Sequence, residues 1–319
     1  MAAAGGTRGA RRLAERLRAE KILSGRSQIT PRSPTVRDLR SWPLPGEAGL
    51  ILINKPSGLP THGGPGVERS VVSLLPALSR SLFGGGAEPL RICHRLDKDS
   101  SGALLLAQSA GSADRVQRAL REHRMSRVYW ALCVGAPTPP EGILDIPLIE
   151  KETPGPQKHF KMALCPRFRV SSDGSVQRFR VSRSAHEAVT QYRTLEKSSG
   201  VSLLELRPLT GVKHQLRSHM ALALNCPILG DHKYSHWGRL APQKLPAPVL
   251  RSLGIPSPQS RSLLLHLHAA QITLQLSPRT PPLVLRCAPP KHFLSALRRL
   301  KFSPQSLQDI PLPPDEGSS

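Results

Sequence analysis

The stretch GALLLA at residues 102–107 contains no polar side chain over the length of a β-strand. A strand with one face in water alternates between polar and apolar residues, so a continuous apolar run predicts a strand that is buried on both faces. Other apolar runs of strand length occur at residues 50–53, 128–134, 201–206 and 263–274. Helical spacing is found at residues 70–78, 114–123 and 215–224. Strands and short helices therefore alternate irregularly, which predicts an α+β fold around a mixed sheet.

Proline, glycine and histidine set the expected limits of these elements. Pro76 is expected to limit the first helix, because proline lacks the N–H that a helix interior needs. His266 and His268 are expected to interrupt the last strand. The stretch PSGLPTHGGPG at residues 56–66 allows no regular element, so its backbone either approaches a ligand closely or simply turns. Residues 239–262 contain five prolines and are expected to be irregular.

The charge balance points to the kind of partner. The chain has 45 Lys and Arg against 22 Asp and Glu, a formal net charge of +23 over 319 residues. Such a balance favours a polyanionic partner such as nucleic acid. The longest apolar stretches fall far short of the roughly 18 apolar residues that cross a bilayer, which excludes an integral membrane protein. The five cysteines lack a CxxC spacing and the N-terminus lacks a secretory signal, so an intracellular, reducing compartment is expected.

No cofactor and no metal are expected. The sequence lacks the GxGxxG and GxxxxGK patterns of nucleotide-binding folds. His214 and His219 are five residues apart, which is not the i, i+4 spacing of a metalloprotease helix. His266 and His268 share one side of a strand, but no third ligand is evident. A metallohydrolase is therefore the least favoured function.

The two ends of the chain differ in composition from the part between them. Residues 1–40 hold nine arginines and Lys21 against three acids, with leucines at near-helical spacing. Such an amphipathic segment is typical of a mitochondrial presequence, and the alternative is a solvated basic arm that helps to hold RNA. A presequence implies the mitochondrial matrix and leaves a nuclear or cytoplasmic pool open. Residues 45–300 are expected to form the catalytic domain, and residues 303–319 to be disordered.

Residues 158–183 combine positive charge with aromatic rings. They carry seven Lys or Arg and one acid, with Phe160, Phe168 and Phe179 between them. Nucleic-acid surfaces use this mixture, since cations bind phosphates and aromatic faces stack on bases. The alternative is a solvated strand face whose phenylalanines are buried.

Two stretches contain residues that could carry chemistry. HRLDKDSSG at residues 94–102 places an Arg and two Asp in a loop between two apolar strands, where sites are commonly built. The alternative is that Asp97 or Asp99 caps a turn or a helix. The second stretch, TGVKHQLRSHMALALNCPILGDHKYS, covers residues 210–235. If its first part is helical, Arg217 has room to project from the first turns.

These stretches resemble the motifs of the RluA-type pseudouridine synthase family. HRLDKDSSGALLLA is similar to the family signature HRLDxxTSGxxxLA, and RVYWALCVG to the Lys/Arg-x-Tyr motif that follows it. PLTGVKHQLRSHMALALNCPILGDHKY is similar to TGRxHQIRVHxxxxGxPIxGDxxY, LINKPSGLPTHGGPG to an early N-K-P loop, and SLLLHLHAAQITL to a late L-H-A strand. The five motifs stand in family order over residues 50–275. Ser100 replaces the usual Thr, and Val212 with Lys213 replaces the usual pair of Arg followed by Thr or Lys.

The resemblance implies the pseudouridine synthase fold, a mixed, mostly antiparallel sheet flanked by helices and loops. It also implies an isomerase that turns uridine into pseudouridine in RNA without a cofactor. Asp97 would be the nucleophile or the ion-pair stabiliser at the sugar or the base, and Arg217 would be its salt-bridge partner. Tyr129 would lie against the target uracil, where its phenol could assist proton removal at C5.

The same motifs imply residues that bind the substrate. Because a uridine in a stem hides its glycosidic bond, the enzyme must extract it, and Arg95 would take the vacated space. Leu216 would pack beside the flipped base, and His94, Lys213 and His214 are expected to bind substrate. A monomer that binds structured rRNA, tRNA or mRNA is expected, with mitochondrial rRNA or tRNA favoured as the substrate, and the sequence leaves the RNA and the uridine open. The alternative function is an RNA-binding or ribosome-assembly factor without catalysis on the same fold.

Overall fold

The computed structural model describes residue 36 and residues 39–43, 49–154, 159–170, 176–178 and 182–303. The presequence or RNA arm expected at residues 1–40 and the disordered tail expected at residues 303–319 lie almost wholly outside the described residues. No helix in the part of the chain that is described is long and apolar enough to cross a membrane.

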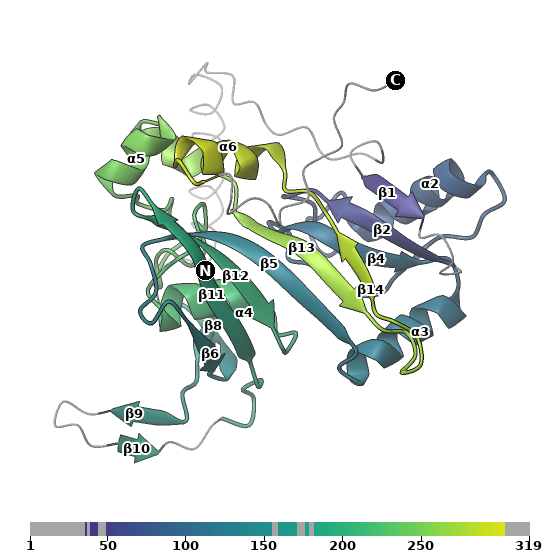
Figure 1. Ribbon diagram of the computed structural model, residues 1–319, viewed down its shortest axis with the longest axis horizontal. Coiled ribbons are helices and arrows are strands. Elements are labelled where there is room, and N and C mark those ends of the chain that lie inside the picture. Colours follow the sequence, from purple (N-terminus) through teal and green to yellow (C-terminus); the bar gives the residue numbers. More distant parts are fainter. Residues whose placement is uncertain are drawn as a thin grey trace, which may run out of the picture. The chain divides into compact units, whose positions relative to one another are not determined.

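A sheet of ten strands organises the described residues (Figure 1). Its strands follow in the order β1 (Arg40–Pro43), β2 (Leu50–Lys55), β4 (Ser101–Ala107), β13 (Leu267–Leu274), β5 (Met125–Val134), β12 (Val201–Pro208), β11 (Val189–Ser198) and β6 (Glu141–Asp145). In addition, β3 (Arg91–Ile92) pairs with β4, and β14 (Leu283–Arg286) pairs with β13. The β4–β13 pair is parallel and the others are antiparallel. The predicted α+β fold with a mixed, mostly antiparallel sheet is confirmed.

Strand β4 explains the apolar run GALLLA, because every residue of the strand is buried. Leu104 and Leu106 belong to the core cluster under helix α2 (Val71–Phe83). Ala103 and Leu105 lie on the other face, in the cluster that includes Val116 of helix α3 (Ala110–Arg121). Side chains of a strand alternate between faces, so a strand covered on both sides needs apolar residues throughout.

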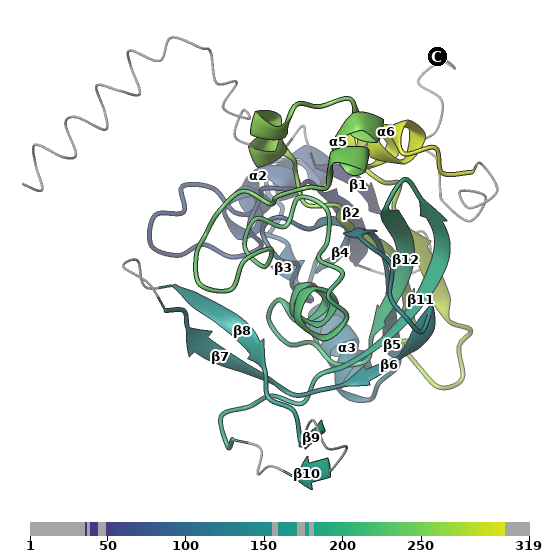
Figure 2. The same ribbon diagram turned by 90° about the vertical axis from the view of Figure 1, so that its left-hand side faces the viewer.

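Three further helices cover the other strands. Helix α4 (Gln215–Ser218) continues as a π-helix (His219–Ala223) and lies within the curve of β5, β12, β11 and β6 (Figure 2). Its Leu216 and Met220 join the cluster that contains Leu204 and Leu206. Helices α5 (Ala247–Leu253) and α6 (Lys291–Arg299) pack in a cluster with Trp130 and Leu132.

Three expectations about element limits are wrong. Helix α2 runs through Pro76 to Phe83, since losing one N–H costs less than the packing of Leu75 and Leu78 gains. His268 lies within β13, where Ser101 Oγ and Cys287 O bind its two ring nitrogens. Residues 239–262 contain α5 and a 3₁₀ helix (Ser257–Ser262), because proline fits the first turn of a helix.

Two small hairpins extend the fold outside the large sheet. One pairs β7 (Leu148–Glu152) with β8 (Phe160–Leu164), and the other pairs β9 (Phe168–Val170) with β10 (Val176–Arg178). The β9–β10 hairpin projects away from the large sheet in both views (Figures 1 and 2). Phe160 and Phe168 are each 55% exposed, so the alternative of buried phenylalanines is wrong for these two. Phe179 lies outside the described residues.

Gly102 brings β4 and β13 unusually close together. Its φ is +112°, and a Cβ at this position would lie 2.2 Å from the carbonyl oxygen of Ala269. No other residue type fits both conditions. The close crossing fixes the loop before β4, which contains Asp97, at the end of the sheet next to β13 and β5.

Candidate active site

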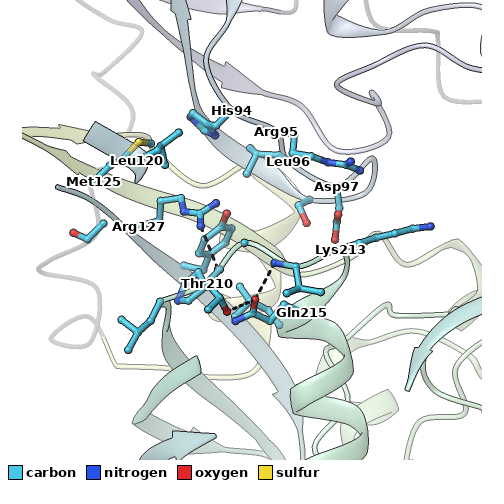
Figure 3. A pocket seen from close by; sticks show the side chains of 18 of the residues that line it. His94, Arg95, Leu96, Asp97, Leu120, Met125, Arg127, Thr210, Lys213 and Gln215 are labelled. Carbon is cyan, nitrogen blue, oxygen red and sulfur yellow. Dashed lines mark hydrogen bonds between the residues drawn. The ribbon is translucent and has the colours of Figure 1, made fainter. Parts of the chain in front are cut away.

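A cavity of about 750 Å³ opens where the loop that contains Asp97, the start of β5 and the segment before α4 meet (Figure 3). Seven of the eight residues predicted from the motifs line it, namely His94, Arg95, Asp97, Tyr129, Lys213, His214 and Leu216. Arg217 lies behind the wall and is 3% exposed. Among the described residues that line the cavity, Asp97 is the only acid.

The loop of residues 56–66 holds the Asp97 loop in place. Thr61 Oγ1 donates to Leu96 O at 2.7 Å and accepts from Leu96 N at 3.1 Å. Ser57 Oγ donates to Asp99 O at 2.7 Å, so the hydrogen bonds fall on both sides of Asp97. The loop therefore contacts another part of the chain, and its close approach to a ligand stays a prediction.

Lys55 joins the same two loops through hydrogen bonds of its buried side chain, and no motif in the sequence indicates this role. The side chain is completely buried, and its Nζ donates to the carbonyl oxygens of Pro56, Leu59 and Lys98 at 2.8 to 3.1 Å. These three bonds use all three protons of an ammonium group. Burial lowers the pKa of Lys55 to about 7, and the carboxylates of Asp99 and Asp97 oppose that shift.

Arg217 does not make the expected ion pair with Asp97. Its Nε and Nη2 donate to the two carboxylate oxygens of Asp231 at 2.8 and 2.7 Å, and Asp231 is fully buried. Its Nη1 lies 3.7 Å from Asp99 Oδ2. Burial acts to lower the pKa of Arg217, but Asp231 outweighs it and the pKa is raised. The guanidinium therefore stays charged and reaches Asp97 through its field rather than by contact.

Asp97 lies in a site that opposes its charge by burial and supports it by nearby cations. Burial raises its pKa above the usual value for aspartate, while Arg217 and Arg95 act in the opposite direction. Asp99 adds to the rise and Lys55 counteracts it. A carboxylate with a raised pKa in a cavity is a common property of reactive acids.

Tyr129 stands on β5 opposite Ala269 of β13 and is 6% exposed. Burial raises the pKa of its phenol, and the neighbouring guanidinium of Arg127 acts against this shift. Arg127 stands between Met125 and Tyr129 on β5, and its Nη2 donates to Thr210 O at 3.4 Å (Figure 3). Arg127 is the first residue of the RVYWALCVG motif, and the motif alone does not indicate what it contacts.

Histidines 94 and 214 are neutral parts of the wall. Burial lowers the pKa of His94 to about 3, and its Nε2 accepts the N–H of Leu105. Burial also lowers the pKa of His214 far below its usual value, and its Nδ1 lies 2.9 Å from the hydroxyl of Tyr234. Lys213 points outward and pairs with Glu150 at 2.7 Å.

Gln215 shapes the rim between β12 and α4. Its Oε1 accepts from Thr210 Oγ1 and Val212 N, and its Nε2 donates to Val189 O and Thr190 Oγ1. Four hydrogen bonds from one amide fix the loop that closes this side of the cavity (Figure 3). Gln215 and Asp231 both stand within quoted motifs, and only the fold shows what they bind.

The profile of the RNA pseudouridylate synthase family matches residues 49–222. The chain belongs to this family. Pseudouridylate synthase RPUSD4, mitochondrial, of Xenopus tropicalis is 62% identical over 99% of this chain and 100% of its own length. The human protein of that name is 42% identical over 92% of this chain and 84% of its own length.

A solved structure, human RNA pseudouridylate synthase domain containing 4, is 44% identical with a TM-score of 0.70, covering 79% of this chain and 90% of its own. Human RNA pseudouridylate synthase domain containing 1 shares the fold, at 21% identity and a TM-score of 0.55. The chain is an RNA pseudouridine synthase, an isomerase, and it is mitochondrial. The expectations for family, activity and organelle are confirmed.

Proposed function

We propose that Asp97 is the catalytic carboxylate of this enzyme and that its substrates are structured mitochondrial RNAs, ribosomal or transfer RNA, in the matrix. The observation that supports the first part is the composition of the cavity wall. Asp97 is the only acid among the described lining residues, and its charge acts on the phenol of Tyr129. A carboxylate beside an aromatic ring, in a cavity large enough for a nucleotide, suits a reaction on a pyrimidine base.

The reaction is an isomerisation and balances without a further reactant. The C1′–N1 bond breaks, the base turns and the C1′–C5 bond forms, while C5 loses a proton and N1 gains one. Asp97 acts either as a nucleophile at the sugar or the base, or as the negative charge that stabilises the fragment formed when the C1′–N1 bond breaks. Because burial raises the pKa of Tyr129, the phenol stays protonated, and its role is to hold the uracil by its ring face.

The uridine must leave its stack to reach Asp97. Arg95 is exposed at the mouth of the cavity and fills the space that the flipped base leaves. Leu216 is 6% exposed and forms an apolar wall for the base. Outside the cavity, Phe160 and Phe168 offer exposed rings for stacking, and Arg178 offers a charge to the phosphates.

Asp97→Asn tests the proposal because the amide keeps the shape and cannot act as a carboxylate. We expect the variant to lose pseudouridine formation while its RNA affinity and its unfolding transition stay close to those of the wild type. Asp114→Asn is the matched control, since Asp114 is exposed on α3 and does not line the cavity. Turnover of Asp97→Asn within tenfold of the wild type would remove Asp97 from this role.

The RNA is tested in cells that contain or lack the protein. We expect mapping of pseudouridine across all transcripts to show sites in mitochondrial rRNA or tRNA that disappear without it and return with the wild-type chain. Return of these sites with Asp97→Asn would overturn the assignment of Asp97. Sites confined to other transcripts would overturn the substrate class. Residues 45–300 are proposed to hold the catalytic site, and the enzyme is proposed to act as a monomer, which sedimentation of the full-length chain checks.

A further inference from the structure

The cavity is longer than the proposed chemistry requires. Beyond Tyr129 it continues to a second end, which we call the far subsite, lined by Gln117, Leu120, Met125, Ser126 and Leu209. Met125 and Tyr129 are four positions apart on β5, which corresponds to roughly 13 Å along the strand. Figure 3 shows Leu120 and Met125 on the opposite side of Arg127 from Asp97. A uridine placed at Asp97 therefore leaves the far subsite open.

The far subsite has the walls that a nucleobase needs. Leu120, Met125 and Leu209 are apolar, and Leu209 is 55% exposed at the rim although it is a large hydrophobic residue. Gln117 and Ser126 supply polar groups, and Gln117 is fixed in place because its Nε2 donates to Cys93 O. An apolar slot with a small number of oriented polar groups is the usual form of a site for a flat heterocycle.

Arg127 occupies the position between the two ends. Met125, Arg127 and Tyr129 stand at every second position of β5, and all three line the cavity. A guanidinium between two base-sized compartments matches the phosphate that joins two nucleotides. The far subsite is therefore spaced and charged for the residue next in the RNA chain.

We propose that the far subsite binds the base of the nucleotide adjacent to the target uridine, so that the enzyme accepts two neighbouring nucleotides and reads the second. This proposal rests on the proposed function in placing the uridine at Asp97. The second base stacks among Leu120, Met125 and Leu209, and the linking phosphate pairs with Arg127. The sequence next to the modified uridine then contributes to substrate choice.

Methyl NMR tests this binding without requiring turnover. The chain has four methionines, and Met125 lines the far subsite, whereas Met162 and Met220 are buried elsewhere and serve as references. With ¹³C-methyl-methionine protein, we expect the dinucleotide UpA or ApU to shift the Met125 signal and uridine monophosphate not to shift it. Met125→Leu identifies the signal. The proposal would be overturned if neither dinucleotide shifted the Met125 signal, or if uridine monophosphate shifted it to the same extent.

Kinetics on an RNA hairpin that contains a mapped target uridine provide the second test. Removing the base at the correct flanking position should lower single-turnover kcat/KM about tenfold, within the range expected for one stacked base. Leu209→Ala should cause a similar loss on intact RNA and no further loss on the abasic RNA. Leu240→Ala is the matched control, since Leu240 is 53% exposed and outside the cavity.

The two failures are distinguishable. The far subsite would be refuted if the losses of kcat/KM caused by Leu209→Ala and by the abasic RNA were additive. It would also be refuted if the wild type kept full activity on RNA that is abasic at either flank. Both results leave the catalytic assignment of Asp97 intact. Full activity of Asp97→Asn on intact RNA would refute the catalytic assignment, and the Met125 signal would still decide whether the second base binds.

Discussion

Replacing Asp231 by Asn should lower the free energy of unfolding by about 3–5 kcal/mol, the usual cost of breaking one partner of a buried ion pair. Arg217 is 3% exposed and Asp231 is fully buried, and two hydrogen bonds join them. The backbone N–H groups of Lys233 and Tyr234 also donate to Asp231 Oδ1, and an asparagine oxygen still accepts them. The substitution therefore removes the charge and the acceptor of the Arg217 Nε hydrogen bond, while the contacts of Oδ1 can remain.

Urea unfolding measures the loss, and an exposed ion pair provides the matched control. Arg167 pairs with Glu187, whose side chain is 62% exposed, so Glu187→Gln should leave the unfolding transition close to that of the wild type. In the double variant Arg217→Gln, Asp231→Asn, no buried charge is left unpaired, and part of the lost stability should return. Single-turnover activity should not return, because Arg217 no longer acts on Asp97. Equal losses for Asp231→Asn and Glu187→Gln would refute this account of the buried pair.

Three other outcomes are expected. Lys55→Met should lower both stability and turnover, because three buried carbonyls lose their donor, whereas Lys98→Met on the exposed side of the same loop should change neither; equal effects in the two variants would contradict this. His268 is buried and burial lowers its pKa to about 4, so the folded state binds fewer protons than the unfolded state. The contribution of neutral His268 to the free energy of unfolding is therefore fully present above pH 6.5 and should fall by about 3 kcal/mol as the pH drops to 4. In urea titrations at a series of pH values, the free energy of unfolding of His268→Gln should depend less on pH than that of the wild type. Residues 1–40 fused to a fluorescent reporter should carry it into mitochondria, and a reporter that stays in the cytosol would favour the basic-arm alternative.

The sequence predicts the fold best where local pattern and tertiary environment agree. The run GALLLA predicts a strand covered on both faces, and β4 is such a strand. Prediction from sequence fails where a residue that is distant in the chain satisfies a group that would otherwise end the element. His268 does not interrupt β13, because Ser101 and Cys287 satisfy its two ring nitrogens from other strands. No local pattern contains those partners.

The site shows the same limit. Its motifs predict eight residues, and seven of them line one cavity although they come from three separate parts of the chain. The resemblance assigned Arg217 to Asp97, but its contacts go to Asp231, fourteen positions further along the chain. Lys55 holds a loop more than forty positions away through Lys98 O. Residues that support a reactive group contact it only in three dimensions, and sequence spacing alone does not reveal them.

The partner of Arg217 bears on how Asp97 can react. If Asp97 held the guanidinium in a two-point pair, its oxygens would be occupied and its pKa would fall well below the usual value. Asp231 takes that pair instead, and burial outweighs the opposing fields of Arg217 and Arg95, so the pKa of Asp97 is raised. The oxygens of Asp97 are then left for the substrate, and the more basic carboxylate is the better nucleophile. In the proposed reaction, Asp231 therefore acts by keeping Arg217 charged, in place and away from the oxygens that react.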